Sequence, residues 1–254
     1  MRGKPADERA LSEVLGFVLT FSVIILSVGI VYGVGTGALG DLRANEQMNA
    51  ADRSMQGLAT NFEALYQQSA PSRGLDVGLK GGSLDLVDGS LEVVVRNESG
   101  TVLNPDNRTI DVGALVRSDQ QTDTELVYEA GALFRIDGPG AVMRHRPVMQ
   151  CTDEAAVVSL LRLEGNVSLS TSGSVRVRGI RRESSLLFPA SGTGQATEAA
   201  QVTVDVSPSA VGSDWSRFFD GRPGWQSLGS GRYACQDVDR AYVRVTTVEL
   251  RTVG

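Results

Sequence analysis

The chain has 254 residues, enough for one sizeable domain with its own core, and it carries a formal net charge of −6. This acid excess argues against nucleic acid as a partner, because a protein that binds phosphates needs a clustered basic face. A single histidine cannot build a histidine-rich metal centre.

The first element in chain order is an uncharged run of 27 residues, Val14 to Gly40. As a helix it would be about 40 Å long, more than the roughly 30 Å hydrocarbon core of a bilayer. The apolar core of a secretory signal peptide is only about 7–15 residues long and is followed by a cleavage site of small residues, which is not found in this sequence. We therefore expect a transmembrane helix over 11–40, preceded by a short leader over 1–10.

Residues 41–68 continue the helical pattern, but with apolar residues on one side only. Six of them recur at alternating spacings of three and four, which is typical of an amphipathic helix: Met48, Ala51, Met55, Leu58, Phe62 and Leu65. The sequence thus predicts one helix of more than fifty residues. Ser69 to Gly74, which contains a proline and ends in a glycine, predicts its end and a turn of the chain.

From residue 75 the apolar period changes from 3.6 to 2, which indicates short strands. We expect strands at 84–86, 91–96, 109–116, 125–128, 132–136, 155–163, 167–170, 174–180, 201–206 and 242–248. Asp88-Gly89 predicts a two-residue hairpin between the first two, and Ser213 to Asp220 predicts a helix with its aromatic residues on one face. The expected fold is α+β: a long N-terminal helix, then a mainly antiparallel β-sandwich or barrel-like domain over 75–254.

Basic residues before the apolar run, Arg2, Lys4 and Arg9, favour a cytoplasmic N-terminus and place the β-rich domain outside the cell membrane. Three Asn-x-Ser/Thr sequons in that domain agree with an external location. These N-glycosylation candidates are Asn97, Asn107 and Asn166.

The two cysteines, Cys151 and Cys235, lie in the same β-rich domain. An external domain allows a disulfide, whose loop of more than eighty residues would stabilise the fold by about 4 kcal/mol on the chain-entropy model. Two unpaired buried thiols are the alternative, and the sequence leaves both open.

No residues in the sequence support catalysis, a cofactor or a metal centre. His145 is expected at the surface, and the acidic groups around Asp85 and Asp237 are interpreted as surface carboxylates beside turns. Residues 176–182 contain four arginines, and Arg176 and Arg178 alternate with valines, so we interpret this stretch as the solvated face of a strand. Trp215 and Trp225 are expected in the core rather than in a sugar site.

The segment 9–16, Arg-Ala-Leu-Ser-Glu-Val-Leu-Gly, follows a basic leader and runs into the apolar helix. It resembles the class III signal of archaeal type IV pilins and pilin-like proteins, and residues 12–16 are close to the haloarchaeal Ser-(Pro/Glu)-Val-(Ile/Leu)-Gly pattern. The resemblance implies a prepilin peptidase that cuts between Ala10 and Leu11 on the cytoplasmic side and leaves the helix on the mature protein. Other pilin-like subunits, of the same or of another kind, would then be partners.

One departure from the family concerns the glutamate at the fifth mature position, which in many pilins pairs with the N-terminal amine of a neighbouring subunit. Cleavage after Ala10 makes Leu15 the fifth residue and Glu13 the third. Glu13 either serves this pairing in a shifted register or marks only the membrane boundary.

Gly29, Gly33 and Gly37 are spaced by four, so they form a stripe on which another helix can approach closely. Together with the resemblance, this stripe predicts a non-enzymatic pilin-like surface subunit that is anchored by its helix and either is assembled into a filament by helix packing or stays a minor subunit at its base or tip. The alternative is a single-pass anchored binding domain that does not polymerise, in which the glycines are incidental.

Overall fold

The computed structural model describes residues 6–67, 69–106, 108–119, 122–190 and 198–253, with side chains for all of these except 6–13, 34–45 and 253. Its first element is α1, a helix of 61 residues from Ala6 to Tyr66, as the sequence predicts. The chain divides into two compact units, Met1–Gln47 and Met48–Gly254. We call residues 48–254 the head, so the head contains the second half of α1 and does not begin at residue 75.

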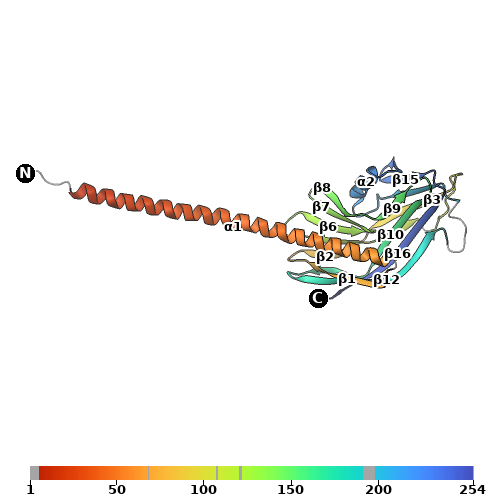
Figure 1. Cartoon of the computed structure of the whole chain (residues 1–254), viewed down its shortest axis with the longest axis horizontal. Coiled ribbons are helices and arrows are strands. Elements are labelled where there is room, and N and C mark those ends of the chain that lie inside the picture. Colours follow the sequence, from red (N-terminus) through yellow and green to blue (C-terminus); the bar gives the residue numbers. More distant parts are fainter. Residues whose placement is uncertain (1–5, 68, 107, 120–121, 191–197, 254) are drawn as a thin grey trace, which may run out of the picture. The chain divides into compact units, whose positions relative to one another are not determined.

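Three β-sheets form the rest of the head (Figure 1), and the strands of each are named in the order in which they neighbour one another. Sheet A contains β1 (Ser72–Gly78), β12 (Ser174–Phe188), β16 (Ala241–Val253), β10 (Ala156–Glu164) and β9 (Val148–Cys151). Sheet B contains β11 (Ser168–Ser170), β2 (Ser83–Val87), β5 (Ala114–Ser118), β6 (Thr124–Glu129), β7 (Ala132–Asp137) and β8 (Gly140–His145). Sheet C contains β14 (Trp225–Gly229), β15 (Arg232–Gln236), β13 (Gln201–Asp205), β3 (Ser90–Arg96) and β4 (Thr109–Asp111).

The sheets are mainly antiparallel, which confirms the predicted fold class. The exception is the pair β10 and β16, which run parallel from Ala156 opposite Ala241 to Glu164 opposite Glu249. Every other pairing between strands of the described residues is antiparallel.

Two cores separate the layers of the head. The helix-side core lies between α1 and sheets A and B, and it includes Phe62 of α1, Tyr128 of β6 and Val248 of β16. The inter-sheet core lies on the other side of sheets A and B, against sheet C and α2 (Gly212–Asp220). Figure 1 shows β3 and β15 on the side of the head away from the end of α1. The order of layers is therefore α1, then sheets A and B, then sheet C with α2.

The predicted hairpin at Asp88-Gly89 is wrong. β2 pairs with β5 and β11 in sheet B, whereas β3 pairs with β13 and β4 in sheet C, so Asp88-Gly89 is a crossover between sheets. The Gly89 carbonyl accepts hydrogen bonds from the backbone N–H groups of Val112 and Gly113, at 2.8 and 3.0 Å, instead of closing a turn. The two strands separate because their apolar residues belong to different cores, Leu84 to the helix-side core and Leu91 to the inter-sheet core.

An aromatic cluster fixes α2 to the inter-sheet core, in agreement with the helix predicted at 213–220. The Trp215 ring lies edge-on to Phe134 of β7 at a centroid distance of 5.2 Å, and Phe219 stacks on Tyr233 of β15 at 4.8 Å. Trp215 is fully buried and Trp225 is 8% exposed, so both tryptophans lie in the core.

Candidate functional site

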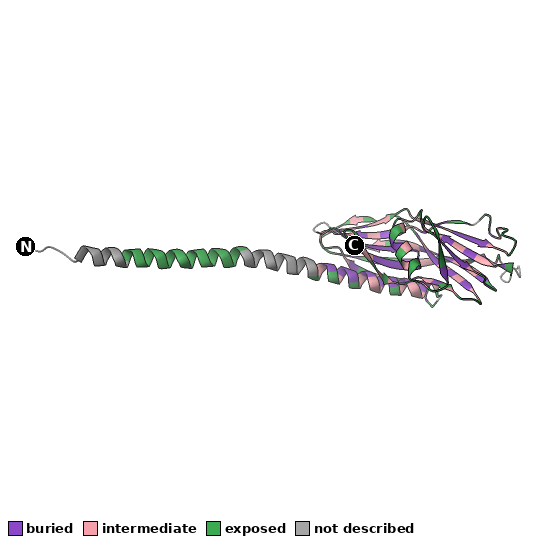
Figure 2. Ribbon diagram, turned by 90° about the horizontal axis from the view of Figure 1, so that it is seen from above, coloured by how far each residue is buried: buried purple, intermediate pink, exposed green. Residues whose placement is uncertain are grey.

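The candidate site is α1 itself, in two parts: an exposed apolar half and a half that is seated in the head. Val14–Gly33 is long and apolar enough to cross a membrane, with a mean hydropathy of 2.7 and none of its residues buried. Its large apolar side chains are between 51% exposed, at Val18, and 75% exposed, at Tyr32 (Figure 2). Apolar surface on every side of a helix requires lipid or other apolar helices around it.

The polar groups of this exposed segment are satisfied within the helix. The hydroxyl of Thr20 donates to the Gly16 carbonyl at 2.8 Å, and that of Ser27 donates to the Ile24 carbonyl at 2.8 Å. Such internal pairing is what a hydrocarbon environment requires, because water is absent there and each unpaired polar group is costly.

The glycine stripe faces open space where the structure describes it. A Cβ atom added to Gly29 or Gly33 would have no neighbour within 4 Å, so no described residue of this chain covers that surface. The surroundings of Gly37 lie outside the described residues. Ala10, Leu11 and Glu13 belong to α1 by their backbone, but their side chains also lie outside the described residues.

The second half of α1 is seated in the head by the predicted apolar stripe. All six residues of the stripe are at most 3% exposed and belong to the helix-side core: Met48, Ala51, Met55, Leu58, Phe62 and Leu65. The Phe62 ring lies edge-on to Tyr128 of β6, with a centroid distance of 5.6 Å. Such aromatic pairs contribute about 0.5–1.5 kcal/mol beyond the burial of their area.

Two glycines let the helix approach sheet A closely. A Cβ atom on Gly179 of β12 would lie 2.7 Å from Phe62 and 2.8 Å from Val248, and one on Gly57 of α1 would lie 2.9 Å from Leu75. A larger residue at Gly179 would collide with several core side chains at once, whereas at Gly57 it would displace only the end of the Leu75 side chain.

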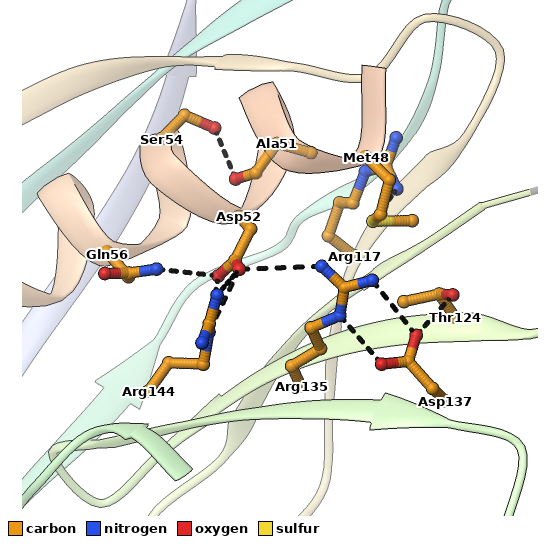
Figure 3. Close-up of polar contacts among 10 residues, drawn as sticks. All are labelled: Met48, Ala51, Asp52, Ser54, Gln56, Arg117, Thr124, Arg135, Asp137 and Arg144. Atoms are coloured by element: carbon orange, nitrogen blue, oxygen red, sulfur yellow. Dashed lines mark hydrogen bonds and ion pairs between the residues drawn. The ribbon is translucent and has the colours of Figure 1, made fainter. Parts of the chain in front are cut away.

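A buried carboxylate, Asp52, adds polar contacts to this seat (Figure 3). Asp52 is 2% exposed and accepts hydrogen bonds from Arg144 of β8 and, at 2.9 Å, from Gln56 one turn along α1. Arg135 of β7 lies 3.6 Å from the same carboxylate and also pairs with Asp137 at 2.8 Å. Sheet B and α1 are therefore joined by a network of two arginines and two aspartates, which we call the Asp52 clamp.

The clamp keeps Asp52 ionised. Burial alone would raise the pKa of this carboxyl group, but the hydrogen bonds from Arg144 and Gln56 and the charges of Arg144 and Arg135 outweigh it and lower the pKa below its usual value. The pKa of Asp137 is lowered in turn, chiefly by its hydrogen bond from Arg135.

A second arginine contact lies beside the clamp, where α1 enters the head. Arg117 of β5 is 1% exposed and donates to the Leu79 carbonyl at 3.0 Å. It also reaches the sulfur of Met48 at 3.6 Å and the carboxylate of Asp119 at 3.1 Å. This arginine therefore fixes the first buried turn of the helix to sheet B.

The C-terminal end of α1 is held by Arg181 of β12, which donates to the Leu65 carbonyl at 3.2 Å. A cation at this position satisfies a carbonyl that has no partner within the helix and opposes the negative end of the helix dipole.

His145 was expected as a surface residue, but it lies half-buried with Nε2 3.6 Å from Glu63 of α1. Burial lowers the pKa of His145, and the charge of Glu63 offsets this only in part.

The other arginines of 176–182 pair on the surface, in agreement with a solvated strand face. Arg176 pairs with Asp76 at 3.1 Å, Arg178 donates to the Ser72 hydroxyl at 2.9 Å, and Arg182 pairs with Glu249.

The remaining predicted site residues lie away from the helix seat. Cys151 of β9 and Cys235 of β15 form a disulfide, with their Cα atoms 5.7 Å apart, which joins sheet A to sheet C. Asn166 is exposed in the turn between β10 and β11, and Asn97 is half-buried, with its side-chain oxygen accepting from the Thr101 N–H at 2.8 Å. Asn107 lies outside the described residues. No group of three or more His, Cys, Asp or Glu that could hold a metal ion occurs in the described part of the chain.

The sequence analysis missed three buried carboxylates: Asp52, Glu129 and Asp214. Glu129 ends β6, is fully buried, and accepts hydrogen bonds from the Trp215 ring N–H at 2.7 Å, from the Ala210 N–H at 3.1 Å and from the Ser209 hydroxyl. Burial raises the pKa of Glu129 despite these bonds. For Asp52 a signal existed, because it follows Met48 by four residues and so lies on the apolar side of the helix. For Glu129 no local signal distinguishes it from a surface residue.

These observations define a protein with one exposed apolar helix that could cross a membrane and that continues directly into a β-rich head. A family of unknown function (DUF7289) matches residues 9–251, so the chain belongs to this family. No curated protein and no solved structure matches the chain.

Proposed function

We propose that the protein is a type IV pilin-like surface subunit, non-enzymatic, cut between Ala10 and Leu11 by a prepilin peptidase and assembled through α1 into an extracellular filament. The observation that carries the proposal is the division of α1. One half is apolar and exposed on all sides, and the other half is locked into the head by a buried stripe. A helix that is fixed in this way would connect its head rigidly to a core of assembled helices.

The orientation of the protein is part of the proposal. Basic residues before the apolar segment keep the N-terminus cytoplasmic, so the head with its disulfide and sequons lies outside the cell. A disulfide that is stable between two sheets supports this, because such bonds persist mainly in oxidising compartments.

The proposed assembly surface is the glycine stripe of α1. The open space around Gly29 and Gly33 leaves room for the backbone of a neighbouring helix, and close packing of small residues is the main source of helix association in lipid.

The first test is the N-terminus of the protein isolated from membranes, measured by mass spectrometry. We expect Leu11 as the first residue. A chain that begins at Met1 or Arg2 would contradict peptidase processing and, with it, the pilin-like assignment.

The second test separates a filament from an anchored monomer. We expect the chain in the fraction sheared from intact cells, and we expect the double variant Gly29→Leu, Gly33→Leu to reduce its amount at least about tenfold while the membrane-bound amount is unchanged. The control is Ser27→Trp, which adds about as many side-chain atoms as the two leucines together, about half a turn round the helix from Gly29.

A correctly processed protein that stays in the membrane after shearing would instead show a single-pass anchored domain that does not polymerise. Equal loss of sheared protein in both variants would show that bulk anywhere on the helix is harmful, and that the glycine stripe is not the assembly surface.

A further inference from the structure

The outer face of sheet C, on the far side of the head from the seated half of α1, carries a concave pocket of about 270 Å³. This is just below the range of about 300–1,000 Å³ that is usual for pockets of drug-sized ligands, so it suits a small ligand. The outward-facing residues of β3 and β13 supply most of its lining: Glu92, Val94, Arg96, Gln201, Thr203 and Asp205. Arg108, Leu228 and Arg232 complete the lining.

Most of the polar side chains in this pocket have no partner. Within the described part of the chain, the side chains of Glu92, Arg108, Gln201, Thr203 and Arg232 make no hydrogen bond or ion pair. On sheet A, by comparison, arginines 176, 178 and 182 are all engaged. On sheet C, five hydrogen-bonding side chains without partners among the described residues line a single pocket.

The cross-strand register explains why the charges do not neutralise one another. Glu92 and Asp205 lie directly opposite each other, and like charges in such a position destabilise a sheet. Arg232 lies directly opposite Asp205, but Asp205 is turned to accept hydrogen bonds from the Ser207 N–H at 2.8 Å and the Ser207 hydroxyl at 2.6 Å. Like charges that face each other in this way lower the stability of the sheet, and such locally unfavourable contacts are typical of binding sites.

The chemistry of the pocket selects the class of ligand. Three guanidinium groups stand with two carboxylates, so neither an anion nor a cation is strongly favoured by the net charge. Donors (Arg108, Arg232), an acceptor (Glu92) and groups that do both (Gln201, Thr203) surround a floor of small residues at Val94 and Thr203. A hydroxyl group both donates and accepts, so several hydroxyls on one rigid ring can pair with all of these groups at once.

We propose that the outer face of sheet C is a binding site for a neutral carbohydrate. The exposed side chain of Leu228, 44% accessible, lines the pocket and offers an apolar contact for the C–H face of a sugar ring. Because sheet C is the layer of the head farthest from the seated half of α1, the pocket remains accessible when the helix side is occupied. The inference does not depend on polymerisation.

The test is saturation-transfer difference NMR on the full chain in detergent micelles, with glucose, galactose, mannose and N-acetylglucosamine as probes, and with phosphate and acetate as anion probes. We expect saturation transfer to at least one of the neutral sugars. We expect Kd for that sugar to rise about tenfold or more in Arg232→Gln and in Thr203→Val, since each removes hydrogen bonds to the ligand.

The matched control is Thr247→Val on β16 of sheet A, which makes the same change at another half-buried strand threonine. Its sugar affinity should equal that of the unmodified chain. The proposal is overturned if no neutral sugar receives saturation, if only phosphate or acetate binds, or if Arg232→Gln and Thr203→Val bind sugar as tightly as Thr247→Val does.

Discussion

At the scale of single residues, Asp52 places a charge inside the contact between α1 and the head. Its carboxylate is held by Arg144 and approached by Arg135. Arg144 is 39% exposed and Arg135 also pairs with Asp137, so water and Asp137 compensate part of the positive charge when Asp52 is neutralised. We expect Asp52→Asn to lower the free energy of unfolding of the head by about 1–3 kcal/mol, measured by denaturant unfolding followed by tryptophan fluorescence.

The control for this change is Asp76→Asn, which breaks the Asp76–Arg176 pair on the surface. Both side chains of that pair are more than half exposed, so the loss should stay below about 1 kcal/mol. Equal losses in the free energy of unfolding would show that the Asp52 clamp stabilises the head no more than a surface ion pair does.

Glu129 makes the free energy of unfolding of the head depend on pH in the opposite direction to Asp52. Because burial raises the pKa of Glu129, the folded state binds its proton more tightly than the unfolded state does. The resulting stabilisation is complete below the ordinary glutamate pKa of 4.5 and is lost as the pH rises through the higher pKa of the folded state. For Asp52, whose pKa is lowered, stability is instead lost as the pH falls below 3.8.

In the unmodified chain, ionisation of Glu129 should lower the stability of the head as the pH rises above about 4.5. We expect Glu129→Gln, which cannot ionise, to lack this loss. The measurement is the midpoint of denaturant unfolding between pH 4 and 8, for the unmodified chain and the variant. His145 is a second titratable group, but it is present in both proteins, so the difference between the two curves isolates Glu129. If the unfolding midpoints of the two proteins changed with pH in parallel, Glu129 would not bind its proton more tightly in the folded state, which would contradict the prediction.

At the scale of elements, the contact between α1 and β12 depends on the absence of a side chain at Gly179. A methyl group there would overlap Phe62 and Val248, both in the helix-side core. We expect Gly179→Ala to lower the free energy of unfolding by about 1–3 kcal/mol, as overpacked cores do. Gly173→Ala is the control, since its nearest neighbour would be 3.8 Å away, and unfolding by denaturant measures both.

The disulfide joins two elements that belong to different sheets, β9 at the edge of sheet A and β15 in sheet C. Its loop spans 84 residues, for which the chain-entropy model gives a stabilisation of about 4 kcal/mol. We expect Cys151→Ala with Cys235→Ala to lower the unfolding free energy by about this amount. Reduction of the unmodified chain should reproduce the loss, and a variant as stable as the oxidised chain would contradict it.

The elements that the sequence predicted best are those with strong local periodicity. All six residues of the α1 stripe are buried where expected, and α2 lies within one residue of its predicted start. β8, β9, β14 and β15 were missed because they are short or expose polar and small residues, so their alternation is weak. The Asp88-Gly89 turn was assigned wrongly because turn chemistry is local, whereas the choice of sheet depends on distant partners.

At the scale of the whole molecule, the same limit applies to the candidate site. The exposed apolar helix is visible in the sequence, but the partners of Asp52 are not, since Arg135 and Arg144 lie more than eighty residues further along the chain. The parallel pairing of β10 with β16 is equally non-local. The sequence pattern shows which side of a helix or strand is apolar, but only the fold determines which element packs against that side.

The division of the chain into units predicts where it can be cut. We expect a fragment of residues 48–254 to be a soluble, folded monomer and a fragment of residues 75–254 to aggregate, because the latter leaves the helix-side core without its seven buried α1 residues. Size-exclusion chromatography and circular dichroism would distinguish them. A folded, monomeric 75–254 fragment would show that α1 is dispensable for the head.

The position of β16 also constrains the order in which the head is made. β16 lies between β12 and β10 inside sheet A, and its residues Val248 and Leu250 complete the core under α1. During translation the apolar stripe of α1 emerges almost two hundred residues before these partners exist. We therefore expect nascent chains that lack β16 to leave this part of the stripe uncovered and to aggregate more readily than complete chains, so the last strand to be made limits the yield of folded protein.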